Sequence, residues 1–349
     1  MKRKNLIIIF ILIIFCVSGC LRVEKSLGDG GVYRSVDQGK SWQQKTSLLS
    51  LPGQQRFLDL VVTNVLVFDP QDSHTLYLGS QNRGLFISID SAESWSEIKR
   101  LPQGSVGAVA VHPLAKHIVY AAVDNEIYKT IDATRTWSKV YLEGDLNRKI
   151  TALKINENYP DLIFAGLSDG RLIKSNNGGE SWTNLENFEK EIRKILISPY
   201  NWQKMYLVVE GKGLYSSNDA GENWFSLEDN YKKICRSSDI KELYFVPGVP
   251  YTLVMTTKKG MLKSRNNGEN WIEYNLLSSK DDLEIYALGF NPQNPEMIYY
   301  TTRKTFYESI DGGENWTPKS IPSKRVAEKF LIDPLNPNIF YLGMGGIIK

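Results

Sequence analysis

Cysteine and histidine are scarce in this sequence of 349 residues, which contains three of each. So few thiols exclude a disulfide framework, and no pair of these residues has the spacing of a metal-ligand motif. We therefore expect no metal and no other cofactor. Cys16 and Cys20 lie near the N-terminus, and Cys235 has no partner in the rest of the chain.

The chain also lacks a large excess of charge of one sign. Its 42 Lys and Arg residues stand against 39 Asp and Glu residues, a formal net charge of +3. Lys2, Arg3 and Lys4 account for that excess, and we expect them to be removed with an N-terminal signal. A general nucleic-acid-binding protein needs a net basic footprint, so we expect no nucleic-acid partner.

Long hydrophobic runs are absent except for Leu6–Val17, which follows the three basic residues. This run is shorter than the roughly 20 residues that span a bilayer, but it has the length of a signal peptide. It ends in Val17-Ser18-Gly19-Cys20, which resembles the lipobox of bacterial lipoproteins. The resemblance implies cleavage before Cys20 and acylation of its thiol, for example with palmitate. An uncleaved anchor, or an ordinary signal with a coincidental cysteine, is the alternative.

These features divide the chain into three parts. We interpret residues 1–19 as a lipoprotein signal peptide, residues 20–30 as a lipid-anchored linker and residues 31–349 as one folded domain. The protein is then expected on the periplasmic or other extracytoplasmic face of a membrane in the bacterial cell envelope. Its domain is long enough to bury a large core without disulfides.

What the sequence has in abundance is one eight-residue phrase, Ser/Thr-x-Asp/Asn-x-x-x-Ser/Thr/Asn-Trp, which occurs seven times. We call each copy a box. Successive box tryptophans are 53, 42, 45, 42, 47 and 45 residues apart. That period is typical of one four-stranded propeller blade.

Each position of the box has a physical interpretation. The third residue has a short side chain that accepts hydrogen bonds from nearby backbone N–H groups, as turns require. The fifth is Gly in five copies, which suits a positive φ, whereas Ala92 and Thr134 are expected to be strained there. The closing Trp is large enough to fill the gap between blades. These structural residues are Asp37, Trp42, Asp90, Trp95, Asp132, Trp137, Asn177, Trp182, Asp219, Trp224, Asn266, Trp271, Asp311 and Trp316.

Four short strands, which we call A to D, repeat around each box, and helical periodicity is absent beyond the extreme N-terminus. The chain begins with strands C and D alone, at Gly31–Ser35 and Trp42–Lys45, and ends with strands A and B, at Ala327–Ile332 and Asn338–Leu342. Pairing these four strands would remove both sheet edges. The sequence therefore predicts an all-β, seven-bladed propeller closed by its two ends. Gly345–Lys349 is a competing candidate for strand C of the closing blade.

The boxes ending at Trp224 and Trp316 resemble the Asp-boxes, or BNR repeats, of sialidases, sortilin and xyloglucanases. Seven boxes, a single propeller and a lipoprotein signal together look most like the photosystem II stability/assembly factor family and its relatives in non-photosynthetic bacteria. The resemblance implies a non-enzymatic protein-binding scaffold or assembly factor. In all of these families the box is a structural turn, so it says little about function.

Glycoside hydrolysis is the enzymatic alternative that the resemblance raises, and it needs two carboxylates or, in sialidases, a Tyr nucleophile with an acidic partner. The sequence lacks the Arg-Ile-Pro motif of sialidases, and it provides one propeller where xyloglucanases join two. Asp145, Asp281 and Asp282 are candidate acids but have the setting of loop residues, and His74, His112 and His117 fit turns or strand starts. We therefore expect no enzyme. The alternative is a secreted glycan-binding or sialidase-like glycoside-hydrolysing propeller.

In a propeller the B-to-C and D-to-A loops share one face, and the boxes lie on the other. The first face is the usual recognition surface. We expect it to be basic across the blades from Gly211 onward and to bind a membrane protein or membrane-associated complex, with the protein itself a monomer. The predicted partner-binding residues are Arg83, Lys212, Lys258, Lys259, Arg303 and Lys304.

Overall fold

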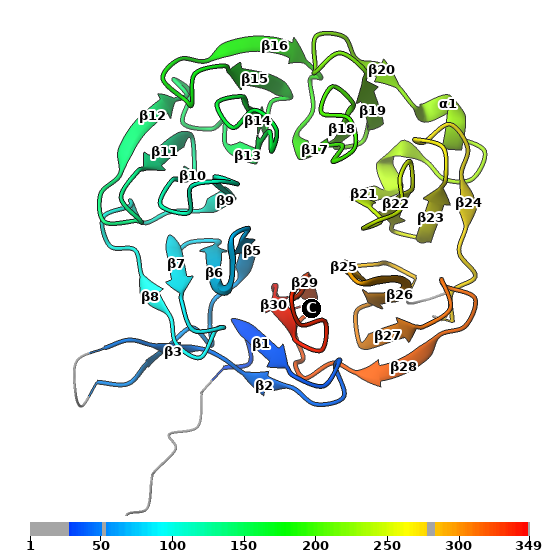
Figure 1. Cartoon of the computed structure of the whole chain (residues 1–349), viewed down its shortest axis with the longest axis horizontal. Helices are drawn as coiled ribbons and strands as arrows, with labels where there is room; N and C mark the ends of the chain where they lie inside the picture. Colours follow the sequence, from blue (N-terminus) through cyan, green and yellow to red (C-terminus); the bar gives the residue numbers. More distant parts are fainter. Residues whose placement is uncertain (1–27, 51–53, 278–282, 348–349) are drawn as a thin grey trace, which may run out of the picture.

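Seven four-stranded antiparallel sheets surround a central opening in the computed structural model, which describes residues 28–50, 54–277 and 283–347 (Figure 1). The predicted seven-bladed all-β propeller is thus confirmed. The proposed signal peptide, Cys20 and most of the linker lie outside the described residues. No helix in the described ranges is long and apolar enough to cross a membrane.

The blades follow the chain order, and strand A is innermost in each (Figure 1). Blade 1 contains β5 (Thr63–Asp69), β6 (Asp72–Ser80), β7 (Leu85–Ser88) and β8 (Ser96–Glu97); blade 2 contains β9 (Val106–Val111), β10 (Val119–Val123), β11 (Glu126–Thr130) and β12 (Ser138–Leu142). Blade 3 contains β13 (Ile150–Ile155), β14 (Ile163–Leu167), β15 (Arg171–Ser175) and β16 (Thr183–Asn187); blade 4 contains β17 (Ile192–Ile197), β18 (Met205–Val209), β19 (Gly213–Ser217) and β20 (Phe225–Ser226). Blade 5 contains β21 (Ile240–Phe245), β22 (Leu253–Thr257), β23 (Gly260–Ser264) and β24 (Ile272–Glu273); blade 6 contains β25 (Ala287–Asn291), β26 (Asn294–Thr301), β27 (Thr305–Ser309) and β28 (Thr317–Ser320).

Blade 7 is built from both ends of the chain, in the order β2-β1-β30-β29. Its strands are β29 (Ala327–Ile332), β30 (Phe340–Met344), β1 (Val32–Ser35) and β2 (Gln43–Gln44). Tyr33 pairs with Leu342 and Ser35 with Phe340 in an antiparallel register. The predicted closure is confirmed, and the competing pairing of Gly345–Lys349 is wrong for its described part, because residues 345–347 form no strand.

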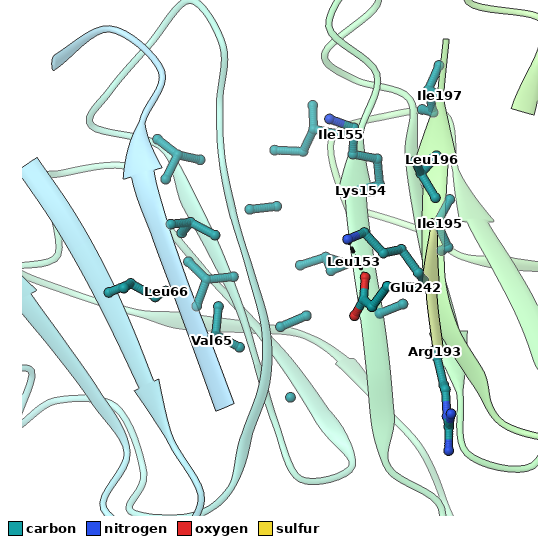
Figure 2. Close-up of a pocket in the computed structure, with 18 of the residues that line it drawn as sticks. Val65, Leu66, Leu153, Lys154, Ile155, Arg193, Ile195, Leu196, Ile197 and Glu242 are labelled. Atoms are coloured by element: carbon teal, nitrogen blue, oxygen red, sulfur yellow. Dashed lines mark hydrogen bonds and ion pairs between the residues drawn. The ribbon is translucent and has the colours of Figure 1, made fainter. Parts of the chain in front are cut away.

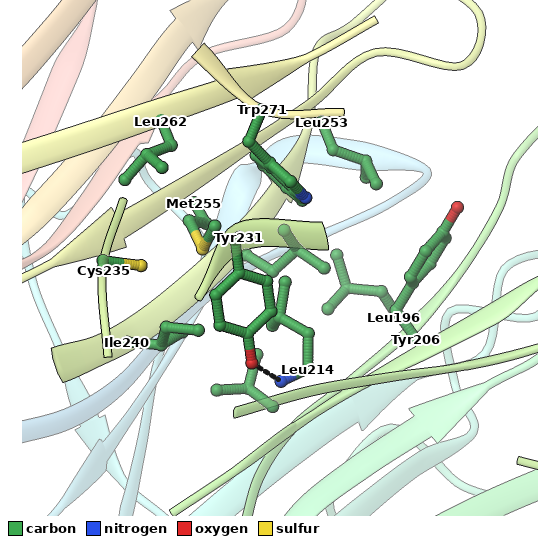
Figure 3. Packing of buried hydrophobic residues seen from close by; sticks show 12 residues of the cluster. Leu196, Tyr206, Leu214, Tyr231, Cys235, Ile240, Leu253, Met255, Leu262 and Trp271 are labelled. Atoms are coloured by element: carbon green, nitrogen blue, oxygen red, sulfur yellow. Dashed lines mark hydrogen bonds between the residues drawn. The ribbon is translucent and has the colours of Figure 1, made fainter. Parts of the chain in front are cut away.

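The core is divided into seven apolar clusters, one between each pair of neighbouring blades. Figure 3 shows the cluster between blades 4 and 5, where Trp271, Met255 and Leu214 surround Tyr231. Each box Trp packs in the cluster that joins its blade to the preceding one: Trp42, Trp95, Trp137, Trp182, Trp224, Trp271 and Trp316. Each box therefore forms a turn in its own blade and, through its Trp, packs that blade against the preceding one.

The box turn is held by its first and third residues. In the box of blade 4, the Ser217 hydroxyl donates to Asp219 Oδ1 at 2.7 Å and accepts from the Gly221 N–H at 2.9 Å. The Asp219 carboxylate also accepts from the backbone and side chain of Asn223, at 2.9 and 2.7 Å. These bonds satisfy the turn's polar groups without a partner strand.

The fourth and fifth residues of every box both have positive φ, whereas the Gly pattern of the sequence predicts it for the fifth alone. Thr134 has φ +69° and Ala92 has φ +67°, so both adopt the conformation that Gly supplies in the other boxes. A left-handed conformation costs a β-branched residue most, because its Cβ substituents crowd the backbone.

Thr134→Gly is therefore expected to raise the free energy of unfolding by about 1 kcal/mol, by relieving strain that exceeds the entropy cost of glycine. Thr317→Gly is the matched control, because Thr317 lies in β28 and is absent from the residues with positive φ. The free energy of unfolding of that control should fall by about 0.5–1 kcal/mol. Chemical denaturation of both variants provides the measurement, and a Thr134→Gly variant no more stable than the parent would contradict the strain.

Three short elements were not predicted. A hairpin of β3 (Ser47–Leu48) and β4 (Arg56–Phe57) projects from the ring beside blade 1 (Figure 1). Trp95 donates its backbone N–H to Ser47 at 2.8 Å, so the hairpin covers the outer edge of blade 1 and buries Trp95 completely. A four-residue helix α1 (Glu228–Tyr231) and a 3₁₀ turn η1 (Ser237–Asp239) lie between blades 4 and 5. One helical turn is too short to show helical periodicity in the sequence, which is why α1 was not predicted.

Candidate functional site

Strands A of blades 1 to 5, together with Lys329 of β29, line a central channel with a cavity volume of about 780 Å³. Most of the wall is apolar, as Val65, Leu66 and Leu153 illustrate (Figure 2). Apolar walls with a few charged groups are typical of ligand sites in proteins. The charged groups of the channel are therefore the first candidates for contacts with a ligand.

An ion pair crosses the channel wall between blades 4 and 5. Lys194 Nζ lies 2.5 Å from Glu242 Oε2, and the two side chains are 33% and 26% exposed. The same ammonium group lies 4.5 Å from the centre of the Tyr244 ring. Burial opposes ionisation of Glu242, but the charge of Lys194, helped by Lys329 and Arg193, outweighs it and lowers the pKa of the Glu242 carboxyl. Glu242 is therefore an ionised partner of Lys194 at neutral pH.

Other cations lie toward the two ends of the channel. Arg193 is the extra residue of a β-bulge in β17, which re-aims its side chain, and it pairs with Glu210. Lys154 lies toward the opposite end (Figure 2) and pairs with Glu157 at 2.9 Å. The lining contains four cations and two acids, and with Glu210, which pairs with Arg193 from outside the lining, one positive charge remains in excess. The charged lining residues are Lys154, Glu157, Arg193, Lys194, Glu242 and Lys329.

The two faces of the ring are distinguished by their turns. In every blade a box N–H donates to a carbonyl in the A-to-B turn or in the first residues of strand B; Ala220 to Gln203 and Ser91 to His74 are examples of the two cases. The B-to-C turns bond instead to the D-to-A loops, as Lys258 does to Asp239 at 2.8 Å. The boxes and the B-to-C turns are therefore on opposite faces, as expected from the sequence.

All six predicted partner-binding residues lie in B-to-C turns, but the structure does not bring them all together. Arg83 lies on blade 1, across the ring from blade 5 (Figure 1), with its guanidinium 5.8 Å from the Phe86 ring centre. The other five follow one another on blades 4, 5 and 6, and we call them the basic sector: Lys212, Lys258, Lys259, Arg303 and Lys304.

Acidic residues neutralise part of the basic sector. Lys212 Nζ lies 2.7 Å from Glu189, and Lys259 Nζ lies 3.3 Å from Asp239. Lys258 and Lys304 are exposed and lie within 4.0 Å of no described carboxylate. Of these four lysines, Lys258 and Lys304 are best placed to meet an incoming acidic group.

The candidate catalytic residues that the structure describes do not assemble into a site. Asp145 pairs with Arg148 at 3.3 Å, while Asp281 and Asp282 lie outside the described residues. His112 Nδ1 accepts from the Leu114 N–H at 3.1 Å, which is a turn role. Among the described residues no group of three or more His, Cys, Asp or Glu side chains could hold a metal ion.

Sequence reasoning missed the charged residues of the channel. Lys154, Lys194, Glu242 and Lys329 all interrupt the apolar sequence of strands A, in three cases beside a further charged residue, which is Arg193, Lys241 or Glu328. That interruption is the available signal, because a strand buried on both faces has no place for a charge unless one face lines a cavity.

Comparisons with known proteins agree on the fold and divide on function. Residues 170–271 match the family model of Sortilin-Vps10, described as sortilin, neurotensin receptor 3. A xyloglucanase of Hypocrea jecorina (strain QM6a) is 24% identical over 198 residues, covering 54% of this chain and 22% of that protein.

Two solved structures with a similar fold differ in how much of their length this chain matches. The GH74 xyloglucanase from Xanthomonas campestris superposes with a TM-score of 0.66 at 16% identity, covering 82% of this chain and 51% of the enzyme. YCF48 bound to D1 peptide superposes with a TM-score of 0.63 at 17% identity, covering 83% of this chain and 94% of YCF48. This chain thus spans about half or less of the xyloglucanases that it matches, whereas it matches nearly all of YCF48. On the repeats, the fold and these matches, the chain is an Asp-box, BNR-type seven-bladed β-propeller, similar in fold to both YCF48 and the GH74 xyloglucanases.

Proposed function

We propose that this protein is a non-enzymatic, lipid-anchored scaffold or assembly factor of the bacterial envelope that binds a membrane protein or membrane-associated complex through the basic sector. The observation that carries the proposal is the position of that sector. Lys258 and Lys304 are exposed on the face opposite the boxes, at the rim of a ring whose channel is net positive. YCF48 has a similar fold, and its structure with D1 peptide supports the proposal that this protein binds a membrane-protein partner.

The N-terminal arm enters the fold on the same face as the basic sector. The Asp29 carboxylate accepts from the Ser323 hydroxyl at 3.1 Å and from the Lys324 N–H at 2.8 Å, both in the D-to-A loop before blade 7. Arg325 Nε lies 3.3 Å from the same carboxylate. Burial alone would raise the pKa of Asp29, but these hydrogen bonds and the Arg325 charge lower it. A lipid anchor attached at Cys20 would therefore turn the basic sector toward the membrane.

The channel supports binding better than hydrolysis. Glycoside hydrolysis by acid and base requires two carboxylates that flank one bond. Of the two acids in the channel lining, Glu242 is neutralised by Lys194 and Glu157 by Lys154. The chemistry of the described channel is therefore that of a cationic receptor, which favours an acidic partner segment.

Charge reversal tests the assignment. Changing Lys258, Lys259, Arg303 and Lys304 to Glu is expected to lower the amount of membrane protein that copurifies by on the order of tenfold or more. Repulsion between the new carboxylates and an acidic partner lowers the affinity more than the loss of the lysine and arginine contacts alone. Reversal of Lys40 and Glu314, exposed on the box face, is the control and should change little. Equal losses from both sets, measured by quantitative mass spectrometry, would defeat the proposal.

A further inference from the structure

A second cavity, of about 460 Å³, lies on the box face between blades 4 and 5. Its walls come from the A-to-B and box turns of both blades and from strands β19 and β20. Because it opens on the face opposite the basic sector, it does not depend on the function proposed above. The lining residues are Ser198, Tyr200, Asn201, Lys204, Ser216, Asn218, Phe225, Leu227, Tyr251, Asn267 and Glu269.

Three aromatic side chains of the lining are exposed. Tyr200, Phe225 and Tyr251 have 46%, 59% and 59% of their surface accessible to solvent. Large aromatic residues are costly to leave in water, and Tyr presents a flat apolar face with a polar edge. Such faces suit a ligand that is itself flat, apolar on its faces and polar at its rim, as a pyranose ring is.

The polar lining is held in place by the turns. Tyr206, a member of the cluster in Figure 3, donates its hydroxyl to the Asn267 carbonyl at 3.1 Å. The Asn267 N–H donates to Tyr251 at 2.9 Å, and the Lys204 N–H donates to Asn201 at 2.9 Å. Most polar groups of the cavity lining are therefore neutral amides and hydroxyls on well-ordered turns, and these groups both donate and accept hydrogen bonds. They match sugar hydroxyl groups, whereas an apolar ligand would leave them unpaired.

Lys204 gives the cavity one partly buried positive charge. Its Nζ donates to Asn218 Oδ1 at 2.9 Å and lies 5.0 Å from the centre of the Tyr206 ring. No described carboxylate lies within 4.0 Å of it, although Glu269 is also in the lining. Burial lowers the pKa of Lys204, and the more distant Glu269 opposes this shift. A ligand carboxylate would offset the desolvation of this ammonium group.

We propose that the cavity binds an oligosaccharide containing a carboxylate-bearing sugar. Its rings stack on Tyr200 and Tyr251, and its carboxylate meets Lys204. Glu269 is the single carboxylate among the lining residues. The lining therefore lacks the pair of acids that a glycosidase needs and is suited to binding without hydrolysis. The same carboxylate on a peptide would satisfy Lys204 but would leave the aromatic faces and amides poorly matched.

The test is an array of oligosaccharides that contain glucuronic, galacturonic, mannuronic or sialic acid, each printed beside its methyl-ester form. The full chain is expected to bind acidic members and to bind their esters at least tenfold more weakly, since the esters keep the ring and lose the charge. Lys204→Met should abolish that preference, and Tyr251→Ala should weaken all binding about tenfold or more.

Tyr159→Ala is the matched control, because Tyr159 is a 54%-exposed tyrosine in the A-to-B turn of blade 3, outside the cavity. It should bind as the parent does. Circular dichroism and thermal unfolding establish that each variant is folded. The inference is overturned if no acidic sugar binds, if esters bind equally well, or if only acidic peptides added to the same assay bind and compete at Lys204.

Discussion

Phe340→Ala is expected to destabilise the protein by about 4 kcal/mol, because it removes a fully buried ring from the blade that closes the propeller. Phe340 begins β30 and pairs with Ser35 of β1, so it lies where the two ends of the chain meet. Its ring centre is 4.8 Å from that of Tyr299 and 5.3 Å from that of Phe330. The cavity left by alanine would open the packing between blades 6 and 7.

Phe225→Ala is the matched control for this loss. The same chemical change is made at a side chain that is 59% exposed, so the expected cost is within about 1 kcal/mol. Urea denaturation of both variants gives the comparison. A Phe340→Ala variant as stable as the control would mean that the terminal strands do not close the ring cooperatively.

The second large effect is expected in acid, where the boxes act together. Hydrogen bonds from the side chain and backbone of the seventh box residue lower the pKa of Asp37, Asp132, Asp219 and Asp311 from 3.8 to about 2. Between these two values the unfolded chain binds protons that the folded chain does not. Lowering the pH from about 4 to about 2 therefore progressively removes their stabilisation, and the melting temperature should fall steeply in this window.

Asp37→Asn combined with Asp132→Asn should make that fall shallower. The natural box of blade 3 shows that the exchange is compatible with the turn: Asn177 Oδ1 accepts from the Ser181 N–H at 3.0 Å, and its Nδ2 donates to the Ser181 hydroxyl at 3.0 Å. Ser41 and Thr136 occupy the same position in the two altered boxes and can rotate their hydroxyls likewise. Melting curves at pH 5, 3.5 and 2.5 measure the slope, and an unchanged slope would show that the box carboxylates do not control acid stability.

The elements that the sequence predicted are those that depend on local turn chemistry. Ser217, Asp219 and Gly221 interact within four residues of one another, so the box can be recognised without knowing the fold. The closing blade followed from counting strands around these boxes. The β3–β4 hairpin was missed because its place depends on a distant edge, where Leu48 bridges to Trp95.

The candidate sites could be predicted only in part for the same reason. The basic sector was predictable because each B-to-C turn lies between two recognisable strands. Which lysines remain unpaired was not, since Glu189 and Asp239 reach them from D-to-A loops. Lys194 meets Glu242 only because two strands A face one channel, and Tyr200 joins Tyr251 only because two blades are neighbours.

Site-specific photo-crosslinking in native envelopes tests the central proposal most directly. A photoreactive amino acid is placed at Lys258 or Lys304 in the basic sector, and at Lys40 or Glu314 on the box face, in the full chain. We predict adducts with one membrane protein or complex, identified by mass spectrometry, from the first two positions and not from the second two. Membrane-protein adducts formed only from the box face, or equally from both faces, would contradict the proposed orientation and its binding surface.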